Sequence, residues 1–135
     1  MVYNILKPLL PDLTEPDYNI YDKYNKSWDP DLKANNIKLA IKSQDYESAL
    51  RYTHSWIFQK TDKEIFQNKD DNKYVAFVSE NVALYEGSIV AIVKVNWLHE
   101  NNLFKPMKRE VLQSNKLAVY LNDLKEFDDL WQLNL

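Results

Sequence analysis

The sequence predicts an α+β domain, with a helical hairpin and a long C-terminal helix packed on a small, mainly antiparallel sheet. Apolar residues recur at helical spacing across residues 30–60 and 115–132, and a stretch of alternating apolar residues lies between them at residues 74–98. We expect a single domain over residues 1–135, with an irregular arm at residues 1–28. A chain of 135 residues, 45% of them hydrophobic, can bury a core without disulfide bonds or metal ions to stabilise it, and it contains no cysteine.

Residues 30–60 are predicted to form the helical hairpin. Asp29 is a favourable N-cap, and Pro30 suits the first helical position, where its missing N–H costs nothing. Asp45 is expected to cap the second helix after a short break, which makes the two helices antiparallel neighbours. The apolar side of the first helix is assigned to Ile37, Leu39, Ala40 and Ile41, and that of the second helix to Tyr46, Ala49, Leu50, Thr53, Trp56 and Ile57.

The run KSQDYESALRY, which begins at Lys42, resembles the turn and second helix of a tetratricopeptide repeat. The resemblance covers about one repeat, and such solenoids need at least about three repeats for stability. The usual glycine of the repeat would fall at Ile37 and its bulky aromatic residue at Thr53. A second copy about 34 residues later would place Ala49 onto Ala83, in a predicted strand. We therefore interpret the similarity as a shared helical hairpin and not as membership of the family.

The middle of the chain is predicted to form the antiparallel sheet. Tyr74 to Val78 is aromatic and β-branched, Asn81 to Tyr85 is a second candidate strand, and Ile89 to Trp97 alternates between apolar and polar residues. Gly87, the only glycine, is expected to occupy a tight turn with positive φ between two strands. Leu103 to Leu112 fits either an edge strand or a short helix.

Residues 115–132 are predicted to form the long helix, with Ser114 as its cap and apolar residues three and four positions apart. Trp56 and Trp131 lie on the apolar faces of their predicted helices, so both are expected in the core. The outer face of the last helix carries Asp123, Glu126, Asp128 and Asp129. Acids near a helix C-terminus oppose its dipole. They form either a solvated face or an acidic surface kept for a partner.

The N-terminal arm contains an aromatic cluster spaced three, three and four residues apart: Tyr18, Tyr21, Tyr24 and Trp28. These residues either pack the arm onto the hairpin or form a binding surface, since Tyr and Trp are frequent at interaction hot spots. Tyr21, Tyr24 and Trp28 are therefore candidate partner-binding residues together with the four acids.

Catalytic and metal-binding motifs are missing from the sequence. A single glycine excludes a Walker loop and a dinucleotide fingerprint, and His54 and His99 have no neighbour at metal-ligand spacing. The acidic loop at Asn68 to Asn72 lacks the glycine and closing glutamate of a calcium loop. We expect no metal and no cofactor, although two carboxylates brought together by folding could act as an acid/base pair.

The net charge of −3, with acids and bases mixed, argues against a nucleic-acid binder. The apolar run in the first residues is too short and too interrupted for a signal peptide, and no later run reaches membrane-spanning length. We therefore expect a cytoplasmic protein without membrane contacts. Its richness in Asn, Lys, Asp, Ile and Tyr indicates an AT-rich bacterial, phage or plasmid gene. The leading interpretation is a non-enzymatic inhibitor that blocks a partner protein with a basic surface, such as an immunity protein, an antitoxin or a phage-encoded inhibitor. The alternative is a small enzyme or small-molecule-binding domain with its site between sheet and helices. The oligomeric state is left open.

Overall fold

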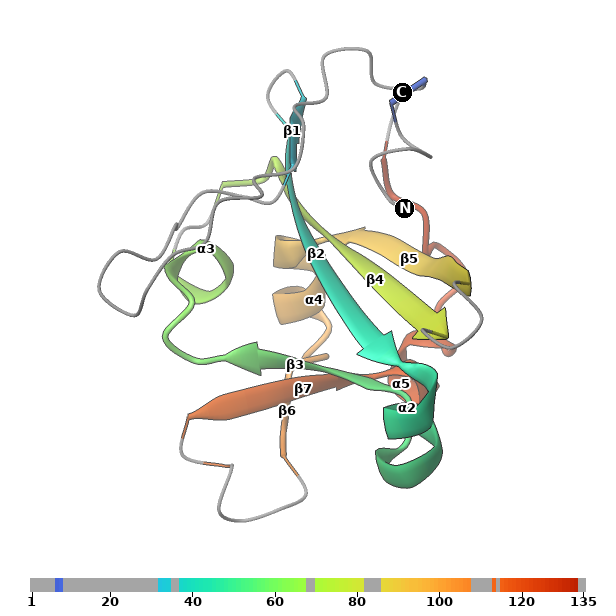
Figure 1. Ribbon diagram of the computed structural model, residues 1–135. Coiled ribbons are helices and arrows are strands. Elements are labelled where there is room, and N and C mark those ends of the chain that lie inside the picture. The colour runs from blue at the N-terminus through green and yellow to red at the C-terminus, as the bar shows by residue number, and fades with distance from the viewer. Residues whose placement is uncertain are drawn as a thin grey trace, which may run out of the picture.

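Two β-sheets form most of the computed structural model, which describes residues 7–8, 32–34, 37–67, 70–81, 86–107, 113 and 115–133 (Figure 1). The four-stranded sheet has the order β1 (Leu32–Ala34), β2 (Ile37–Asp45), β4 (Lys73–Asn81), β5 (Glu86–Lys94). The three-stranded sheet has the order β3 (Ser55–Gln59), β7 (Lys116–Tyr120), β6 (Lys105–Pro106). The helices of the described residues are short: α2 (Tyr46–Tyr52), α3 (Lys63–Phe66), α4 (Val95–Glu100) and α5 (Leu121–Leu124).

Strand β4 is the centre of the four-stranded sheet. It pairs in parallel with β2 and antiparallel with β5, with Ala76 opposite Ile41 on one side and opposite Ile92 on the other. Two parallel neighbours need a crossover connection, and residues 46–72 supply it through α2, β3 and α3. In Figure 1, β3 and β7 lie below the four-stranded sheet and run across the direction of β2.

The side chains of β4 are buried on both faces of the sheet, as expected for a central strand. Alternate residues point to opposite faces, so β4 contributes to two hydrophobic clusters. We call these the outer cluster, on the face away from the three-stranded sheet, and the inner cluster, between the two sheets. The outer cluster comprises Leu32, Leu39, Tyr74, Ala76, Val78, Ile92 and Leu133. The inner cluster comprises Trp56, Phe58, Ile65, Val75, Phe77, Ala91, Val93, Val95, Leu98, Leu103, Val119 and Leu124.

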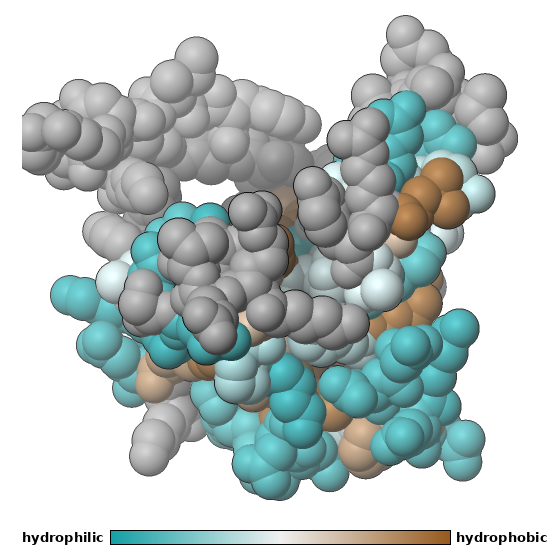
Figure 2. All heavy atoms as spheres, turned by 90° about the horizontal axis from the view of Figure 1, so that it is seen from below, coloured by the Kyte–Doolittle hydropathy of each residue, from teal (hydrophilic) through white to brown (hydrophobic). Residues whose placement is uncertain are grey.

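Aromatic rings join the two sheets within the inner cluster. The rings of Trp56 and Phe77 lie 5.0 Å apart between centroids, and those of Phe58 and Phe77 lie 6.1 Å apart. The Trp56 indole N–H donates to the Val78 carbonyl at 2.9 Å, so this polar group keeps a hydrogen-bond partner although the side chain is buried. Figure 2 shows the molecule from below, where most visible described side chains are hydrophilic and the hydrophobic ones form separate small areas.

A β-bulge in β5 adapts this strand to the inner cluster. Phe77 lies opposite Ala91 whereas Val78 lies opposite Ile89, which leaves Val90 as the extra residue. A bulge places two consecutive side chains on one side of the sheet. Accordingly Val90 and Ala91 both pack on the inner cluster, while Ile89 packs on the outer cluster.

The predicted helical hairpin is wrong. Ile37 to Asp45 forms strand β2, and only Tyr46–Tyr52 of the second predicted helix is helical. The apolar residues of β2 also alternate with a period of two, and β-branched isoleucines favour the pleated strand. Asp45 does precede α2 at the N-cap position, but its side chain makes no capping hydrogen bond. The proposed start at Asp29 and Pro30 lies outside the described residues.

The predicted long C-terminal helix is also wrong. Lys116–Tyr120 forms strand β7, only Leu121–Leu124 is helical, and the chain then continues without regular structure to a single bridge at Trp131. Val119 pairs with Trp56 across β3 and β7, and this contact between strands outweighs the helical spacing of the leucines. The α+β expectation is thus replaced by a mainly β architecture with two sheets.

Of the remaining predictions, some are confirmed and others are wrong. The strand at Tyr74 to Val78 is confirmed within β4. The strand predicted at Ile89 to Trp97 is confirmed as far as Lys94, in β5, which pairs antiparallel with β4, but its last three residues belong to α4. The candidate strand at Asn81 to Tyr85 lies outside the described residues apart from Asn81, which ends β4. Trp56 is in the core, with 1% of its surface exposed, but it lies on a strand. Trp131 is 45% exposed, so its predicted burial is wrong. Gly87 lies within β5 opposite Glu80 and does not have positive φ, so the turn predicted at this residue is wrong too.

Candidate functional site

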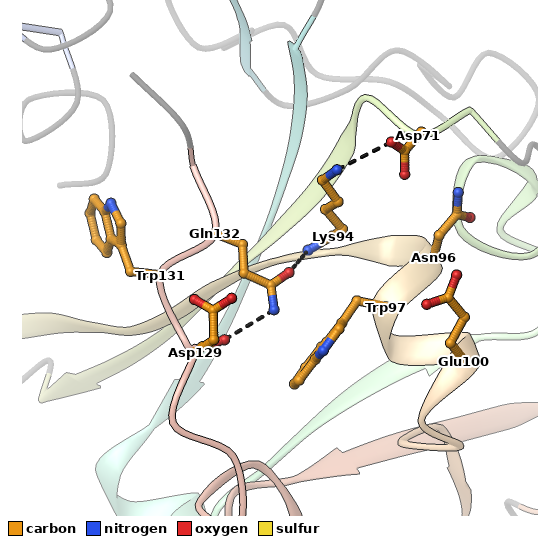
Figure 3. Close-up of a pocket in the computed structure, with 8 residues that line it drawn as sticks. All are labelled: Asp71, Lys94, Asn96, Trp97, Glu100, Asp129, Trp131 and Gln132. Atoms are coloured by element: carbon orange, nitrogen blue, oxygen red, sulfur yellow. Dashed lines mark hydrogen bonds and ion pairs between the residues drawn. The ribbon is translucent and has the colours of Figure 1, made fainter.

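A groove opens where β5 ends and α4 begins, with a volume of about 370 Å³. Its first wall comes from the sheet and α4, because Lys94 ends β5 and the next turns carry Asn96, Trp97 and Glu100. Asp71, from the turn before β4, closes one end. The second wall consists of Asp129, Trp131 and Gln132 (Figure 3). Residues 129–133 are called the strap below.

The strap runs along the free edge of β5 as a short parallel addition. The Ile92 N–H donates to the Leu130 carbonyl at 2.8 Å, and the Gln132 N–H donates to the Ile92 carbonyl at 2.8 Å. The Gln132 side chain continues this pattern, since its Oε1 accepts from the Lys94 N–H at 2.8 Å and its Nε2 donates to the Asp129 carbonyl at 3.0 Å. The glutamine thus takes the place of a main-chain carbonyl and sets the position of the second wall.

Lys94 and Asp71 form the ion pair at one end of the groove. The Lys94 Nζ lies 3.1 Å from the Asp71 carboxylate. The hydrogen bond that Lys94 donates to Asp71 raises the pKa of Lys94 above its ordinary value of 10.5, and the charges of Tyr74, Asp71 and Glu100 act in the same direction. The Asp71 side chain is 76% exposed, so solvent screens this pair.

The groove carries more negative than positive charge. Three carboxylates line it, those of Asp71, Glu100 and Asp129, against the single ammonium group of Lys94. That ammonium group pairs with Asp71. Within the described part of the chain, no salt bridge joins Glu100 or Asp129 to a cationic side chain. The groove therefore presents two carboxylates available to a cation from outside.

The indole ring of Trp97 supplies an apolar surface inside the groove. Trp97 points from α4 toward the strap in Figure 3 and packs edge-on against Phe127, with ring centroids 4.9 Å apart. Trp131 points outward from the strap in the same view. A tryptophan beside carboxylates favours an ammonium or guanidinium group, because the ring face attracts cations and the carboxylates accept their N–H bonds.

Two further ion pairs lie at the same end of the four-stranded sheet. Lys73, at the start of β4, pairs with Glu64 of α3 and also donates to the Glu64 carbonyl at 3.2 Å. Lys38 of β2 lies 3.9 Å from Asp70. Together with Lys94 and Asp71, these pairs fasten α3 and the turn before β4 to three adjacent strands.

The structure places the predicted acids in different surroundings. Asp129 lines the groove, whereas Asp123 lies in α5 and Glu126 and Asp128 lie on the turn and bend that lead to the strap. The helix end invoked for their unfavourable dipole does not exist at these residues. Tyr21, Tyr24 and Trp28 lie outside the described residues.

Sequence reasoning missed most of the groove. The sequence pattern predicts Trp97 in a strand and Trp131 in the core, it places Asp71 only within an acidic loop, and it does not single out Glu100. The lining residues come from segments separated by more than twenty positions, and only the pairing of the strap with β5 brings them together. No local spacing could have signalled this.

Neither a metal site nor a helical membrane span is found in the part of the chain that the structure describes. Among the described residues, no group of three or more His, Cys, Asp or Glu could hold a metal ion. No helix in that part of the chain is long and apolar enough to span a membrane. Comparison of the chain with protein-family models, with curated proteins and with solved structures found no match.

Proposed function

We propose that this chain is a protein-binding module that takes a cationic side chain of a basic partner into the groove and blocks the surface that it covers. One observation carries the proposal: Glu100 and Asp129 face the same groove as the Trp97 indole, and no described cationic side chain pairs with either carboxylate. Either carboxylate can accept the N–H bonds of a guanidinium or ammonium group, and the indole face attracts the charge of such a group.

The other predicted acids fit a supporting role in this proposal. Glu126 and Asp128 are exposed beside the strap and outside the groove. Charges at the rim of an interface mainly steer the encounter and act through the association rate, whereas charges in the contact determine how long the complex lasts. We therefore propose that Glu100 and Asp129 bind the cation, whereas Glu126 and Asp128 attract the basic partner from a distance.

The first test measures binding of a triarginine peptide to the whole chain by tryptophan fluorescence. Glu100→Gln combined with Asp129→Asn should weaken binding roughly tenfold or more, because both charge-assisted contacts are lost. The matched control, Glu126→Gln combined with Asp128→Asn, removes the same charge outside the groove. It should change the affinity by less than about threefold and act mainly at low salt. Equal effects of the two double variants, or no binding to the unaltered chain, would overturn the proposal.

The second test concerns inhibition. A protein captured by the tagged chain supports the proposal only if the groove double variant fails to capture it and the chain reduces the activity of that protein. A small cationic molecule is the alternative occupant, favoured by a volume in the range of small-ligand sites. Spermidine binding as tightly as the basic protein would favour this alternative.

A further inference from the structure

We propose that the strap is a gate: its docking on β5 builds the groove, and its release from β5 takes the groove apart. Three of the eight lining residues belong to residues 129–133, and they make up the whole wall opposite α4. Asp129, one of the two carboxylates assigned to the cation, therefore reaches its position only while the strap is docked.

The strap is held by few contacts. A single bridge joins Trp131 to Ile92, with two main-chain hydrogen bonds and a third that the Lys94 N–H donates to the Gln132 side chain. For comparison, β4 pairs with β5 over eight residue pairs. Segments with few buried apolar contacts and exposed hydrogen bonds open at a lower free energy than the core. Asp129 and Trp131 are exposed, and Leu133 is the one buried side chain of the strap, so the strap has few buried apolar contacts, like such a segment.

Two leucines fasten the strap to opposite faces of the sheet. Leu130 packs against the inner cluster, and Leu133, with 6% of its surface exposed, belongs to the outer cluster. The strap therefore crosses the edge of β5 from one face to the other. Leu133 does not line the groove. This separation allows docking to be weakened without altering any residue that would touch the ligand.

Docking and ligand binding should be coupled in both directions. A cation that contacts Asp129 on the strap binds the docked form and must favour it. By reciprocity, a change that lowers the docked population of the strap lowers the affinity for the ligand by the same factor. This coupling rests on the proposed function, whereas the opening of the strap itself can be measured without any ligand.

The first experiment follows amide hydrogen exchange in the unaltered chain. The amides of Ile92 and Lys94 donate hydrogen bonds to the strap, and the amide of Gln132 donates one from the strap to β5. The amides of Val75 and Phe77 lie in the central strand β4. We expect the strap-dependent amides to exchange at least roughly tenfold faster than the β4 amides, and the triarginine peptide to slow them selectively. Exchange at the rate of β4 would mean that the strap opens only when the whole protein unfolds. That result overturns the gate and leaves the proposed cation site intact.

The second experiment compares Leu133→Ala with Leu39→Ala. Both remove a buried leucine from the outer cluster, but only Leu133 belongs to the strap. Leu133→Ala should weaken triarginine binding roughly tenfold, because the docked population falls, and should speed exchange at Ile92. Leu39→Ala should leave the affinity of the folded protein within about twofold. Equal losses in the two variants would overturn the gate. If either variant does not fold, exchange in the unaltered chain still decides.

Discussion

Lys73 is the one charged side chain that the fold buries among the described residues, with 3% of its surface exposed. Its ammonium group lies against the Glu64 carboxylate, whose side chain remains 32% exposed. The two partners therefore differ in their access to water. Loss of the lysine leaves a carboxylate on a partly exposed side chain, of which only the Oε2 atom facing Lys73 is known to be buried. Loss of the carboxylate leaves an ammonium group inside the protein.

This asymmetry predicts unequal effects of two substitutions. Glu64→Gln should lower the free energy of unfolding by about 3 kcal/mol, because it leaves a buried charge without its ionic partner. Lys73→Met should cost roughly 1 kcal/mol or less, since it replaces the buried charge with an apolar side chain of similar length. Urea denaturation of the two variants measures the difference. If Lys73→Met were the more damaging change, the ion pair would contribute more than its desolvation costs.

The ion pair of Lys94 and Asp71 predicts a dependence on alkaline pH. Folding raises the pKa of Lys94 above 10.5, chiefly through the hydrogen bond to Asp71. The folded state therefore holds this proton more tightly than the unfolded state. The stabilisation is fully present below the unfolded pKa and is lost as the pH rises through the folded pKa.

The measurement compares the unaltered chain with Asp71→Asn across this range of pH. The difference between their free energies of unfolding should be constant up to about pH 9 and should shrink above about pH 10. It should also decrease with added salt, because Asp71 is exposed. Asp70→Asn is a suitable control, since Asp70 lies near Lys38 instead. A difference that grows with pH would contradict the assignment.

At the scale of elements, the sequence predicted strands better than helices. The strand over Tyr74 to Val78 could be predicted because its residues are β-branched or aromatic, and a turn follows it. The segment from Ile37 to Ile41 fits two periods at once, and a sequence pattern alone does not choose between them. In the structure, β-branched side chains and pairing with β4 favour the strand. The last helix failed for the same reason, since Val119 belongs to a strand pair that no local pattern reveals.

The prediction for Gly87 changes with its place in β5. This residue is exposed, pairs with Glu80 and does not need positive φ. Gly87→Val should therefore keep or slightly raise the thermal midpoint, because valine favours strands and glycine weakens them. Ser88→Val, at the neighbouring exposed position, is the matched control and should behave similarly. A marked fall for Gly87→Val alone would restore the turn originally predicted there.

At the scale of the whole molecule, Gln44 ties the two sheets together at one corner. This residue of β2 accepts from the Ser55 N–H at 3.0 Å and donates to the Thr53 carbonyl at 3.0 Å. Ser55 is the first residue of β3, Thr53 caps the C-terminus of α2 two residues earlier, and Ser55 is 9% exposed. The Gln44 side chain, which belongs to the four-stranded sheet, therefore provides a hydrogen-bond acceptor for the Ser55 N–H at the edge of the three-stranded sheet.

Removal of this link should destabilise the molecule. Gln44→Ala leaves the Ser55 N–H without its partner in a nearly buried position, which should cost about 1–3 kcal/mol. Ser43→Ala, at the exposed neighbouring position of β2, should cost less than about 0.5 kcal/mol. Chemical denaturation followed by tryptophan fluorescence measures both variants. Equal stability of the two would show that water replaces the Gln44 contact without loss.

The strap has a consequence for the behaviour of the protein at high concentration. β5 is an outermost strand of its sheet, and the strap covers the polar backbone groups of Ile92 that would otherwise face outward. An uncovered strand edge is a template on which another molecule can add a strand, and repeated addition leads to aggregation. The contact that shapes the groove therefore also keeps neighbouring molecules from joining edge to edge. Any ligand that holds the strap in place should in the same way keep the protein in solution.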